Sequence, residues 1–367
     1  MMKILVIVNA KFGYDGISIV ATNYYLYQDK TDIEMDLLTI NPINDVLAKS
    51  ITTYGNKHFV LDNRNSNPIS YILKLIKIIS ENKYDIVYVH GNSATMAVEL
   101  IAAKIARCKV RVAHCHTTQC NHKFFNRLLL PLFNHLYTDC CTCSKEAGEY
   151  LFGNRDYYIV SNGINIDDYT FSNLVRERVR RENQIQDRFV IGHIGRFTYL
   201  KNQEFLLKTL KEILDMGENA VLLLVGEGEL QNELEKQAKT MGISDRVIFY
   251  GTTDKVYEIV QAMDCFVFPS LFEGLGIVAI EAQASGLPCV ASTKVPRKIL
   301  INDDTTFLSL DKPVKVWAEE IIKRRTAIEK RVKGISSTKI KMKEDHFDIV
   351  SNCLEMRLFY EKILKKD

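Results

Sequence analysis

The chain has 367 residues, of which 47% are apolar and 25% are charged, with 48 Lys and Arg against 45 Asp and Glu. These values are ordinary for folded globular proteins, and they exclude a disordered chain, a collagen and a coiled-coil array. The net charge of +3 is too small to indicate a nucleic-acid-binding protein.

The length favours about two domains, each large enough to bury its own core. No apolar run approaches the roughly 18 residues that cross a membrane, and the apolar start of the chain lacks the cleavage site of a secretory signal. Nine cysteines without such a signal indicate a reducing compartment rather than a disulfide framework. We therefore expect a cytoplasmic protein of two domains.

Short Val- and Ile-rich runs alternate with longer amphipathic stretches in the first half of the chain. The runs have the length of strands that are buried on both faces of a parallel sheet. The predicted strands of this half are 3–8, 34–39, 58–61, 84–90, 109–114, 139–143 and 157–160. The predicted helices are 69–81, 94–107, 124–137 and 145–152.

The second half repeats this alternation, which predicts two doubly wound α/β domains. Its predicted strands are 189–194, 220–225, 246–250, 265–268 and 288–291. Its predicted helices are 204–216, 229–241, 255–263 and 277–285. The charged, weakly periodic segment 167–187 is the best boundary between the halves, and residues 347–364 have the periodicity of a further helix.

The most informative segment is 269–282, with the sequence PSLFEGLGIVAIEA. A buried strand ends at its start, a loop with two glycines follows, and a helix is predicted to begin near Gly276. The free N–H groups of a helix start suit a phosphate. A nucleotide sugar fits this geometry, with ribose hydroxyls at Glu281 in the second turn and sugar hydroxyls at Glu273 before the helix. The alternative is that Glu273 only complements the helix dipole and Glu281 faces solvent.

A second segment, 194–202 (IGRFTYLKN), places Arg196 and Lys201 five residues apart across a loop. The loop follows the first predicted strand of the second half. Arg offers a fixed fork of donors and Lys a compact charge, a combination that suits a leaving diphosphate. The alternative is a solvated loop with two ordinary surface cations.

Together these segments resemble family four of the retaining glycosyltransferases, which includes bacterial capsular and exopolysaccharide glycosyltransferases. The resemblance extends from about Lys3 to the C-terminal helix, and its most specific element is the E-x(7)-E pattern of Glu273 and Glu281. The segments 161–165 (SNGIN) and 225–230 (VGEGEL) match further family motifs in the expected order.

The resemblance implies a GT-B architecture, in which two doubly wound Rossmann-like domains face each other across a cleft. Residues 1–170 would form the acceptor-side domain and residues 171–345 the nucleotide-sugar-binding domain, with a C-terminal helix within 346–367 packing back on the first domain. It implies a retaining hexosyl- or N-acetylhexosaminyltransferase with a nucleotide-diphosphate sugar as donor, most commonly a UDP-sugar. The acceptor would be a lipid-linked glycan or an oligosaccharide in surface polysaccharide biosynthesis.

The resemblance also implies that no metal or other cofactor is required, and the absence of a D-x-D motif agrees with cations neutralising the leaving group. The catalytic residues implied by the resemblance are Arg196, Lys201, Glu273 and His116. The donor-binding residues implied are Gly16, Arg196, Lys201, Glu273, Gly274, Leu275, Gly276, Ile277 and Glu281.

The match in the first half has departures from the family pattern. Gly16 belongs to the glycine loop after the first strand, but Asp15 replaces the first glycine and Ser18 stands where an acid is common. His116 matches the histidine that lies near the transferred sugar, with packing or capping as its alternative role. His90 ends the preceding strand, where a structural role is expected.

A basic, aromatic stretch over 121–137 has the character of a helix that binds an anionic membrane surface. From residue 100 to residue 138 there are six Lys or Arg and no acid. In a glycosyltransferase with a lipid-linked acceptor, this pattern favours a peripheral location on the inner face of the cell membrane. The alternative is a helix packed on its own sheet with cations on its solvated face.

The cysteines of 140–143 (CCTC) form a C-x-x-C spacing that also occurs in zinc and redox sites. Cys115, Cys120, His114, His116 and His122 are near it in sequence. Cys140 and Cys143 fall in a predicted strand, where an odd offset directs side chains to opposite faces, and no second pair completes a zinc set. Buried, inert thiols are therefore expected.

Other classes of protein share parts of this pattern. A nucleotide-sugar epimerase would use the same fold and donor without an acceptor, and a non-catalytic sugar-nucleotide-binding protein would not need the charged residues of the two segments. A hydride-transferring oxidoreductase is disfavoured because the first turn, 9–13 (NAKFG), lacks G-x-G-x-x-G.

Overall fold

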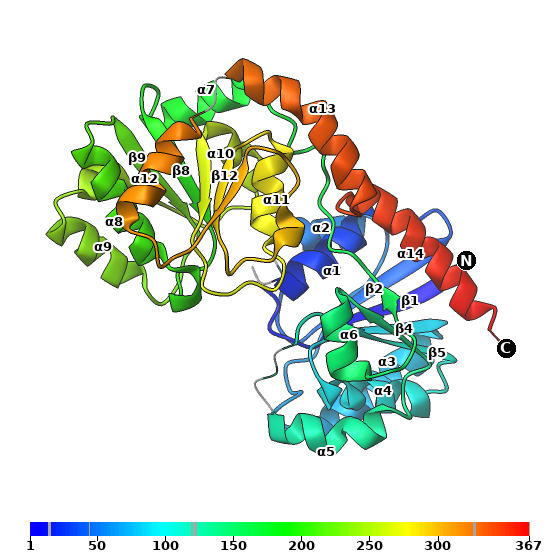
Figure 1. The fold of residues 1–367 in the computed structure, drawn as a ribbon. Coiled ribbons are helices and arrows are strands. Elements are labelled where there is room, and N and C mark those ends of the chain that lie inside the picture. Colours follow the sequence, from blue (N-terminus) through cyan, green and yellow to red (C-terminus); the bar gives the residue numbers. More distant parts are fainter. Residues whose placement is uncertain (14–15, 44, 119, 121–122, 326–327, 367) are drawn as a thin grey trace. The chain divides into compact units, whose positions relative to one another are not determined.

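A computed structural model of the chain describes residues 1–13, 16–43, 45–118, 120, 123–325 and 328–366 (Figure 1). The chain divides into two compact units. Unit 1 consists of Met1–Ile164 together with His346–Asp367, and unit 2 consists of Asn165–Asp345. The chain thus passes into unit 2 after Ile164, close to the boundary expected at residue 170, and returns to unit 1 at His346.

Unit 1 contains a parallel sheet with the strand order β3-β2-β1-β4-β5-β6-β7. The strands are β1 Met2–Val8, β2 Ile33–Thr39, β3 His58–Val60, β4 Ile86–Gly91, β5 Val110–Cys115, β6 Asp139–Thr142 and β7 Tyr158–Ile159. The order reverses direction at β1, so this is the doubly wound topology in which ligands bind beyond the carboxyl ends of the strands.

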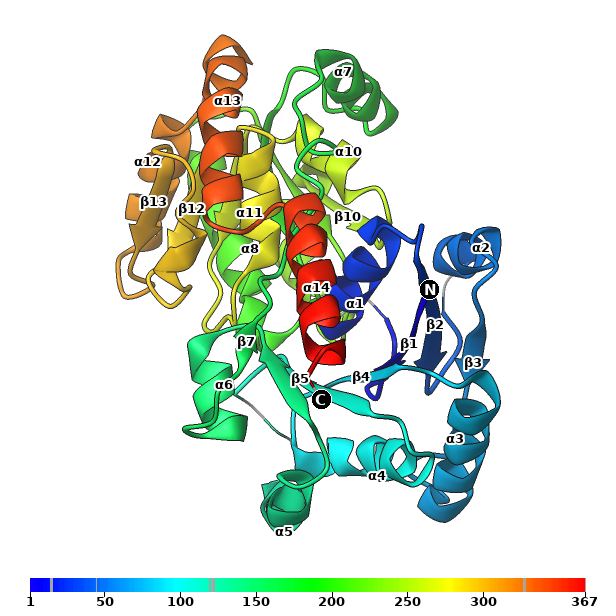
Figure 2. The same ribbon diagram turned by 90° about the vertical axis from the view of Figure 1, so that its right-hand side faces the viewer.

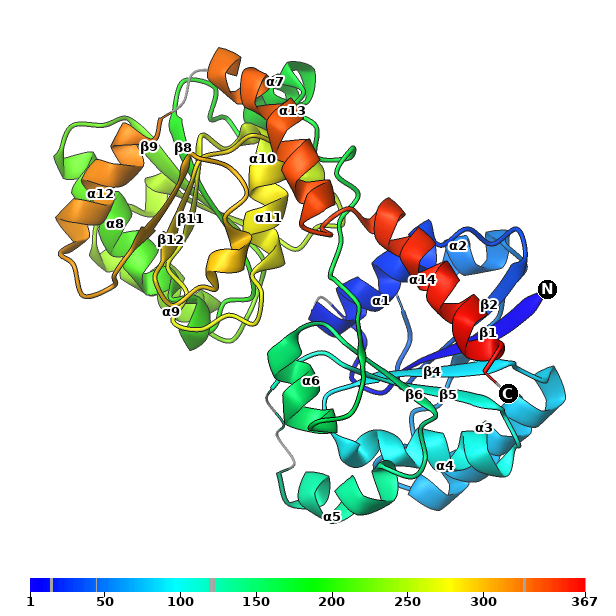
Figure 3. The same ribbon diagram turned by 45° about the vertical axis from the view of Figure 1, so that its right-hand side comes forward.

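Helices cover both faces of this sheet (Figures 2 and 3). They are α1 Gly16–Tyr27, α2 Asp45–Thr53, α3 Pro68–Asn82, the short η1 Ala94–Met96, α4 Ala97–Ile105, α5 Lys123–Phe133, α6 Lys145–Phe152 and α14 Ile349–Leu364. Successive side chains of β1 point to opposite faces. Leu5 and Ile7 pack with α3 and α4, whereas Ile4 and Val6 pack with α1 and α14.

Unit 2 repeats the topology, with the parallel strand order β10-β9-β8-β11-β12-β13. The strands are β8 Phe189–Ile194, β9 Ala220–Val225, β10 Val247–Gly251, β11 Cys265–Phe268, β12 Cys289–Ser292 and β13 Thr305–Leu308. The helices are α7 Asn173–Glu182, η2 Tyr199–Lys201, α8 Gln203–Asp215, α9 Gln231–Thr240, η3 Ser244–Arg246, α10 Val256–Ala262, α11 Ile277–Ala284, η4 Arg297–Ile299, α12 Val314–Lys323 and α13 Ile328–Glu344.

The prediction of two doubly wound α/β halves is confirmed, and strands 189–194, 220–225 and 265–268 have the predicted bounds. Helices α1, α2, α12 and α13 and strand β13 were not predicted. The segment 167–187, which was expected to be the boundary, belongs to unit 2 and contains α7. Two of its arginines are buried: Arg176 donates hydrogen bonds to backbone oxygens at the end of α10, and Arg180 contacts Asp264.

None of the described helices combines the length and the apolar character that crossing a bilayer requires.

Candidate active site

Three loops of unit 2 leave the carboxyl ends of neighbouring strands. Strand β8 pairs with β9 on one side and with β11 on the other. The loops that follow β8, β9 and β11 therefore meet at one edge of the sheet. They carry the three charged motifs of the second half, so the fold brings these motifs together.

Lys201 and Glu273 form the closest charged contact at this edge. Lys201 Nζ lies 2.6 Å from Glu273 Oε1, and both side chains are largely buried, with 22% and 10% exposed. The ammonium also lies over the ring of Phe268, 5.2 Å from its centroid. The two residues were predicted from separate segments, and the structure joins them in one ion pair.

Arg196 lies on the same loop as Lys201 but is far more accessible. Its side chain is 73% exposed, and its ionic partner among the described residues is Glu229, at 3.5 Å. An exposed pair of this kind contributes little to stability. The guanidinium is therefore available to an incoming anion.

The VGEGEL segment supports the backbone beside Arg196. Phe197 N donates to Glu227 O over 2.8 Å, and Gly195 N donates to Val225 O over 2.9 Å. A Cβ added at Gly228 would lie 2.3 Å from Phe197 O, a distance that real side chains do not reach. The second glycine of this motif is needed because the two loops run backbone against backbone.

Helix α11 begins after Gly276, as predicted. Gly276 has φ +86°, in the left-handed region that favours glycine, and no side chain caps the helix. The preceding Gly274 is exposed, Leu275 is half-buried, and so is Ile277 at the first helical position. The backbone amides at this helix start have no side-chain cap, and such groups suit a phosphate.

Glu281 occupies the second turn of α11 and is buried, with 9% of its surface exposed. The alternative in which it faces solvent is therefore wrong. Burial raises the pKa of Glu281 to about 7, although a hydrogen bond from Tyr169 favours the ionised form. A buried carboxyl group with one hydrogen-bond partner can accept bonds from further hydroxyls.

The glycine loop of unit 1 is only partly described. Asp15 lies outside the described residues, whereas Gly16 begins α1 and has open space where a Cβ would be. Ser18, at the position where an acid is common, is buried, and its hydroxyl accepts a hydrogen bond from Gly13 N. Gly16 belongs to unit 1 and is not among the residues that unit 2 brings together.

Three histidines cluster at the carboxyl ends of β4 and β5. His90 on β4 is paired in register with His114 on β5, and His116 follows β5. His90 Nδ1 lies 2.8 Å from His116 Nε2, and the rings of His114 and His116 stack with centroids 4.0 Å apart. Burial lowers the pKa of His116 to about 3. His116, the predicted site residue, thus contacts His90, for which a structural role was expected, and His114, which was named only as a neighbour of the cysteines.

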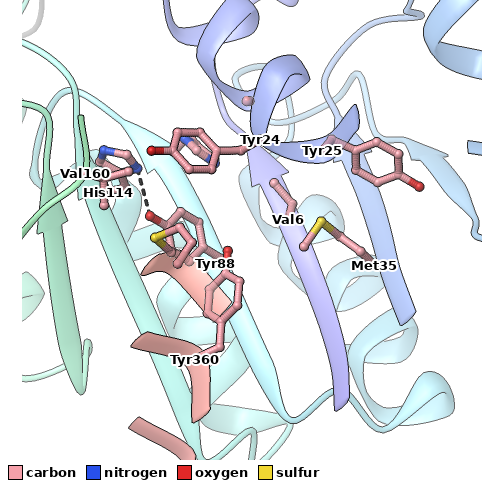
Figure 4. A pocket seen from close by; sticks show the side chains of 11 residues that line it. Val6, Tyr24, Tyr25, Met35, Tyr88, His114, Val160 and Tyr360 are labelled. Atoms are coloured by element: carbon pink, nitrogen blue, oxygen red, sulfur yellow. Dashed lines mark hydrogen bonds between the residues drawn. The ribbon is translucent and has the colours of Figure 1, made fainter. Parts of the chain in front are cut away.

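Figure 4 shows the buried surroundings of His114. The Tyr88 hydroxyl lies 2.9 Å from His114 Nδ1. Tyr88, His90 and His114 line a cavity of about 10 Å³. Tyr88 was not predicted as a functional residue, because a tyrosine within a buried strand gives no local signal of a polar partner on the next strand.

Helix α5 carries the basic, aromatic stretch predicted over 121–137, of which residues 121 and 122 lie outside the described part of the chain. Its buried side contributes Phe133 to the core of unit 1. Four large apolar side chains are exposed on it: Phe124, Phe125, Leu128 and Leu132. The helix thus packs on unit 1 through Phe133, and both cations (Lys123 and Arg127) and apolar side chains lie on its exposed side.

The C-x-x-C cysteines have different partners. Cys140 Sγ donates to Asp156 O, and Cys143 Sγ donates to His116 O. Burial raises the pKa of Cys140 to about 12, as expected for an inert thiol. His122 lies outside the described residues, and no grouping of metal-ligating side chains among the described residues includes a cysteine.

Two known families match the chain in sequence. Residues 14–168 match the family described as Glycosyltransferase Family 4, and residues 175–335 match the family described as Glycosyl transferases group 1. The first match falls almost entirely in unit 1 and the second in unit 2.

Individual relatives agree with these matches. EpsF of Bacillus subtilis (strain 168), which is named as a glycosyltransferase, is 33% identical over 329 residues, covering 85% of either chain. The Escherichia coli UDP-Gal:alpha-D-GlcNAc-diphosphoundecaprenol alpha-1,3-galactosyltransferase is 24% identical over 296 residues, covering 76% of either chain. The crystal structure of Anabaena Alr3699/HepE in complex with UDP-glucose has the same fold, with a TM-score of 0.80 at 20% identity over 99% of this chain and 100% of that one.

Proposed function

The chain belongs to glycosyltransferase family four and has the two-domain GT-B fold, and from this premise we propose that it is a retaining enzyme of surface polysaccharide biosynthesis. Its donor is a UDP-sugar that carries a hexose or an N-acetylhexosamine. Its acceptor is a lipid-linked or oligosaccharide glycan at the inner face of the cell membrane.

The observation that carries this proposal is the convergence of Lys201, Glu273 and Glu281 at one edge of the sheet of unit 2. In the proposed complex the diphosphate lies on the amides at the start of α11, beside Lys201. The ribose hydroxyls donate to Glu281, and the sugar hydroxyls contact Glu273. His116 and Gly16 contribute from the acceptor-side unit.

The proposed chemistry requires charge neutralisation at the leaving group. The bond between the anomeric carbon and the diphosphate oxygen breaks while the acceptor hydroxyl oxygen bonds to that carbon, and the hydroxyl proton leaves with the diphosphate. Negative charge develops on the departing oxygen, where Arg196 and Lys201 stabilise it. These cations take the place that a divalent metal occupies in other transferases, and we propose that transfer requires no metal.

The relatives support the identity of donor and acceptor. The Anabaena neighbour binds UDP-glucose, and the name of the Escherichia coli relative specifies a UDP-sugar donor and a lipid diphosphate acceptor. Both sequence relatives are named as glycosyltransferases, which favours transfer over the epimerase and over a non-catalytic binding protein.

A thermal-unfolding panel with UDP, GDP, ADP and NAD tests the donor site. UDP at about 100 times its Kd should stabilise the wild-type protein by about 2.7 kcal/mol, and Glu281→Ala should lose most of this effect. Glu233→Ala, at an exposed position of α9, is the matched control and should respond like wild type. Stabilisation by NAD alone, or equal UDP stabilisation in wild type and Glu281→Ala, would contradict the proposed site.

Turnover with a polyprenyl-diphosphate sugar acceptor separates binding from chemistry. Arg196→Ala should lower kcat by about 10²–10³-fold, as loss of one charge-stabilising donor does in other enzymes, with a smaller change in UDP affinity. Equal turnover in wild type and Arg196→Ala would remove Arg196 from the mechanism. Conversion of the UDP-sugar to its epimer without a glycosylated product would favour the epimerase.

We further propose that α5 binds an anionic lipid surface. Its exposed apolar side chains Phe124 and Leu128 adjoin the basic residues Lys123 and Arg127. Lys104 of α4 lies close by, since its Nζ donates to His135 O over 3.3 Å. Apolar side chains flanked by cations are typical of segments that lie in the headgroup region of anionic membranes.

Sedimentation with vesicles of anionic and of zwitterionic lipid tests this surface. Wild type should bind the anionic vesicles at low salt and bind them less at high salt. The double variant Phe124→Ser/Leu128→Ser should lose binding, whereas Leu174→Ser, at a still more exposed leucine of unit 2, should retain it. Failure of the wild-type protein to bind anionic vesicles at either salt concentration would overturn the proposal.

A further inference from the structure

The histidine cluster of unit 1 contains more nitrogen ligands than one catalytic histidine requires. His90, His114 and His116 each offer one ring nitrogen, and these three nitrogens all lie within 4.8 Å of one another. Among the described residues this is the grouping of His, Cys and acidic side chains that meets the geometry of a metal site. The strand register explains the proximity, because His90 and His114 are directly paired across β4 and β5.

A second observation concerns His114. Its Nδ1 is fixed by the Tyr88 hydroxyl at 2.9 Å, while its Nε2 is buried and has no hydrogen-bond partner. An orphaned buried nitrogen costs free energy unless something binds it. Metal-ligating histidines have this arrangement, in which one nitrogen is held by a neighbouring polar group and the other is free for the ion.

We propose that His90, His114 and His116 bind one divalent transition-metal ion, with a fourth coordination position left open. Three imidazoles without a carboxylate favour Zn²⁺, Co²⁺, Ni²⁺ or Cu²⁺ over Mg²⁺ or Ca²⁺. Zinc–nitrogen bonds of about 2.0–2.1 Å in a tetrahedral site place neighbouring nitrogens about 3.4 Å apart. Reaching this spacing requires the stacked rings to rotate, and the ion replaces the hydrogen bond between His90 Nδ1 and His116 Nε2.

The consequence for activity rests on the proposed function. His116 is the residue that the proposed function places at the transferred sugar. An ion that ties His116 to His90 and His114 removes it from the substrate, so the metal-loaded enzyme is the inactive form. The ion at this site therefore inhibits the enzyme. The proposed transfer itself requires no ion.

Metal binding is measured directly on the full chain after removal of adventitious metal with a chelator. Titration with Co²⁺, followed by its visible absorption, and calorimetry with Zn²⁺ should show one ion per chain with nitrogen ligands. His114→Phe, which keeps an aromatic ring but has no ring nitrogen, and His90→Gln should each raise the Kd by at least about tenfold. His135→Gln, at an exposed histidine of the same unit, should bind like wild type.

Cysteines are the main competing ligands, and Cys143 contacts the cluster because its Sγ donates to the backbone oxygen of His116. Cys143→Ser should leave Co²⁺ binding unchanged and its spectrum free of thiolate bands. Loss of binding in Cys143→Ser, or equal affinity in wild type, His114→Phe and His90→Gln, would overturn the proposal.

A thermal-unfolding measurement keeps the test valid if one histidine variant folds poorly. Zn²⁺ should raise the unfolding temperature of wild type and of His135→Gln, and should not raise that of whichever histidine variant folds. UDP should stabilise unit 2 equally in all of these proteins, so failure of the metal site is distinguishable from failure of the donor site. A Zn²⁺ shift that persists in His90→Gln would contradict the site.

Discussion

At the scale of single residues, Glu281 makes the stability of the protein depend on pH. Burial raises the pKa of this carboxyl group from 4.5 to about 7. The folded state therefore retains a proton that the unfolded chain loses between pH 4.5 and 7. Stability from this group is fully present below pH 4.5 and is lost as the pH rises through 7, by up to about 3 kcal/mol. Denaturant unfolding should show Glu281→Gln gaining stability over wild type as the pH rises from 5 to 8.

Glu320 provides a control, because the pKa of its carboxyl group is shifted in the direction opposite to that of Glu281. Burial alone would raise the pKa of Glu320, but hydrogen bonds from Arg324 and Thr306 offset this and lower the pKa. Its contribution to stability is present near neutral pH and is lost at low pH. Glu320→Gln should thus be least stable relative to wild type at neutral pH. A stability difference between Glu281→Gln and wild type that does not change with pH would contradict the role of Glu281 burial.

At the scale of elements, the loop after β9 holds the loop after β8 in place. Gly228→Ala would force a Cβ to within 2.3 Å of Phe197 O, so the backbone next to Arg196 must move. We expect a loss of about 1–3 kcal/mol in stability and a fall in kcat larger than the fall in UDP affinity. Unfolding, UDP binding and turnover measured on one preparation check this result.

Gly334→Ala is the matched control for this glycine. Gly334 lies within α13 with no atom within 4 Å of an added Cβ. Alanine in a helix interior gains about 0.5–1 kcal/mol relative to glycine. Gly334→Ala should therefore leave stability unchanged or raise it, with unchanged turnover. If Gly228→Ala and Gly334→Ala lose the same amount of activity, the packing of the two loops does not explain the loss in Gly228→Ala.

Helices and strands could be predicted from the sequence where the pattern that indicates them lies within the element itself. Strands such as 220–225 are continuous aliphatic runs that are buried on both faces, so hydrophobicity alone indicates them. Helix α7 was missed because its arginines suggest a solvated segment. In the fold Arg176 and Arg180 are buried against backbone oxygens and Asp264, more than 80 positions away along the chain. No local pattern contains that pairing.

The same limit applies to the candidate site. The charged residues of unit 2 were predicted because each lies in a motif that follows a strand. The ion pair of Lys201 with Glu273 joins two such motifs, and the unpartnered nitrogen of His114 arises only when β4 and β5 come into register. The sequence thus indicates candidate residues of the site, whereas the contacts between them follow only from the fold.

At the scale of the whole molecule, helix α14 completes the core of unit 1 although unit 2 precedes it in the chain. Its side chains Met356, Phe359, Tyr360 and Ile363 pack with β1 and α1, and α14 lies beside α1 (Figure 2). Met356 is 2% exposed, so Met356→Ala should destabilise unit 1 by about 2–5 kcal/mol. UDP binding, which belongs to unit 2, should be unchanged in titrations at temperatures where the variant is folded.

Leu358→Ala is the control for α14. Leu358 is 66% exposed on the same helix, and its removal should change stability by no more than about 0.5 kcal/mol. Equal destabilisation by both substitutions, or loss of UDP binding in the folded Met356→Ala protein, would contradict the assignment of α14 to unit 1.

The return of the chain to unit 1 also sets an order of folding during synthesis. Domains fold as units while the chain emerges from the ribosome, the N-terminal ones usually first. Here residues 165–345 are complete before α14 is made, so unit 2 can reach its final fold while unit 1 still exposes the apolar face of α1 and β1 that α14 covers. The first unit to be translated is therefore the last to be finished, and its nascent form is the stage at which chaperones have a hydrophobic surface to bind.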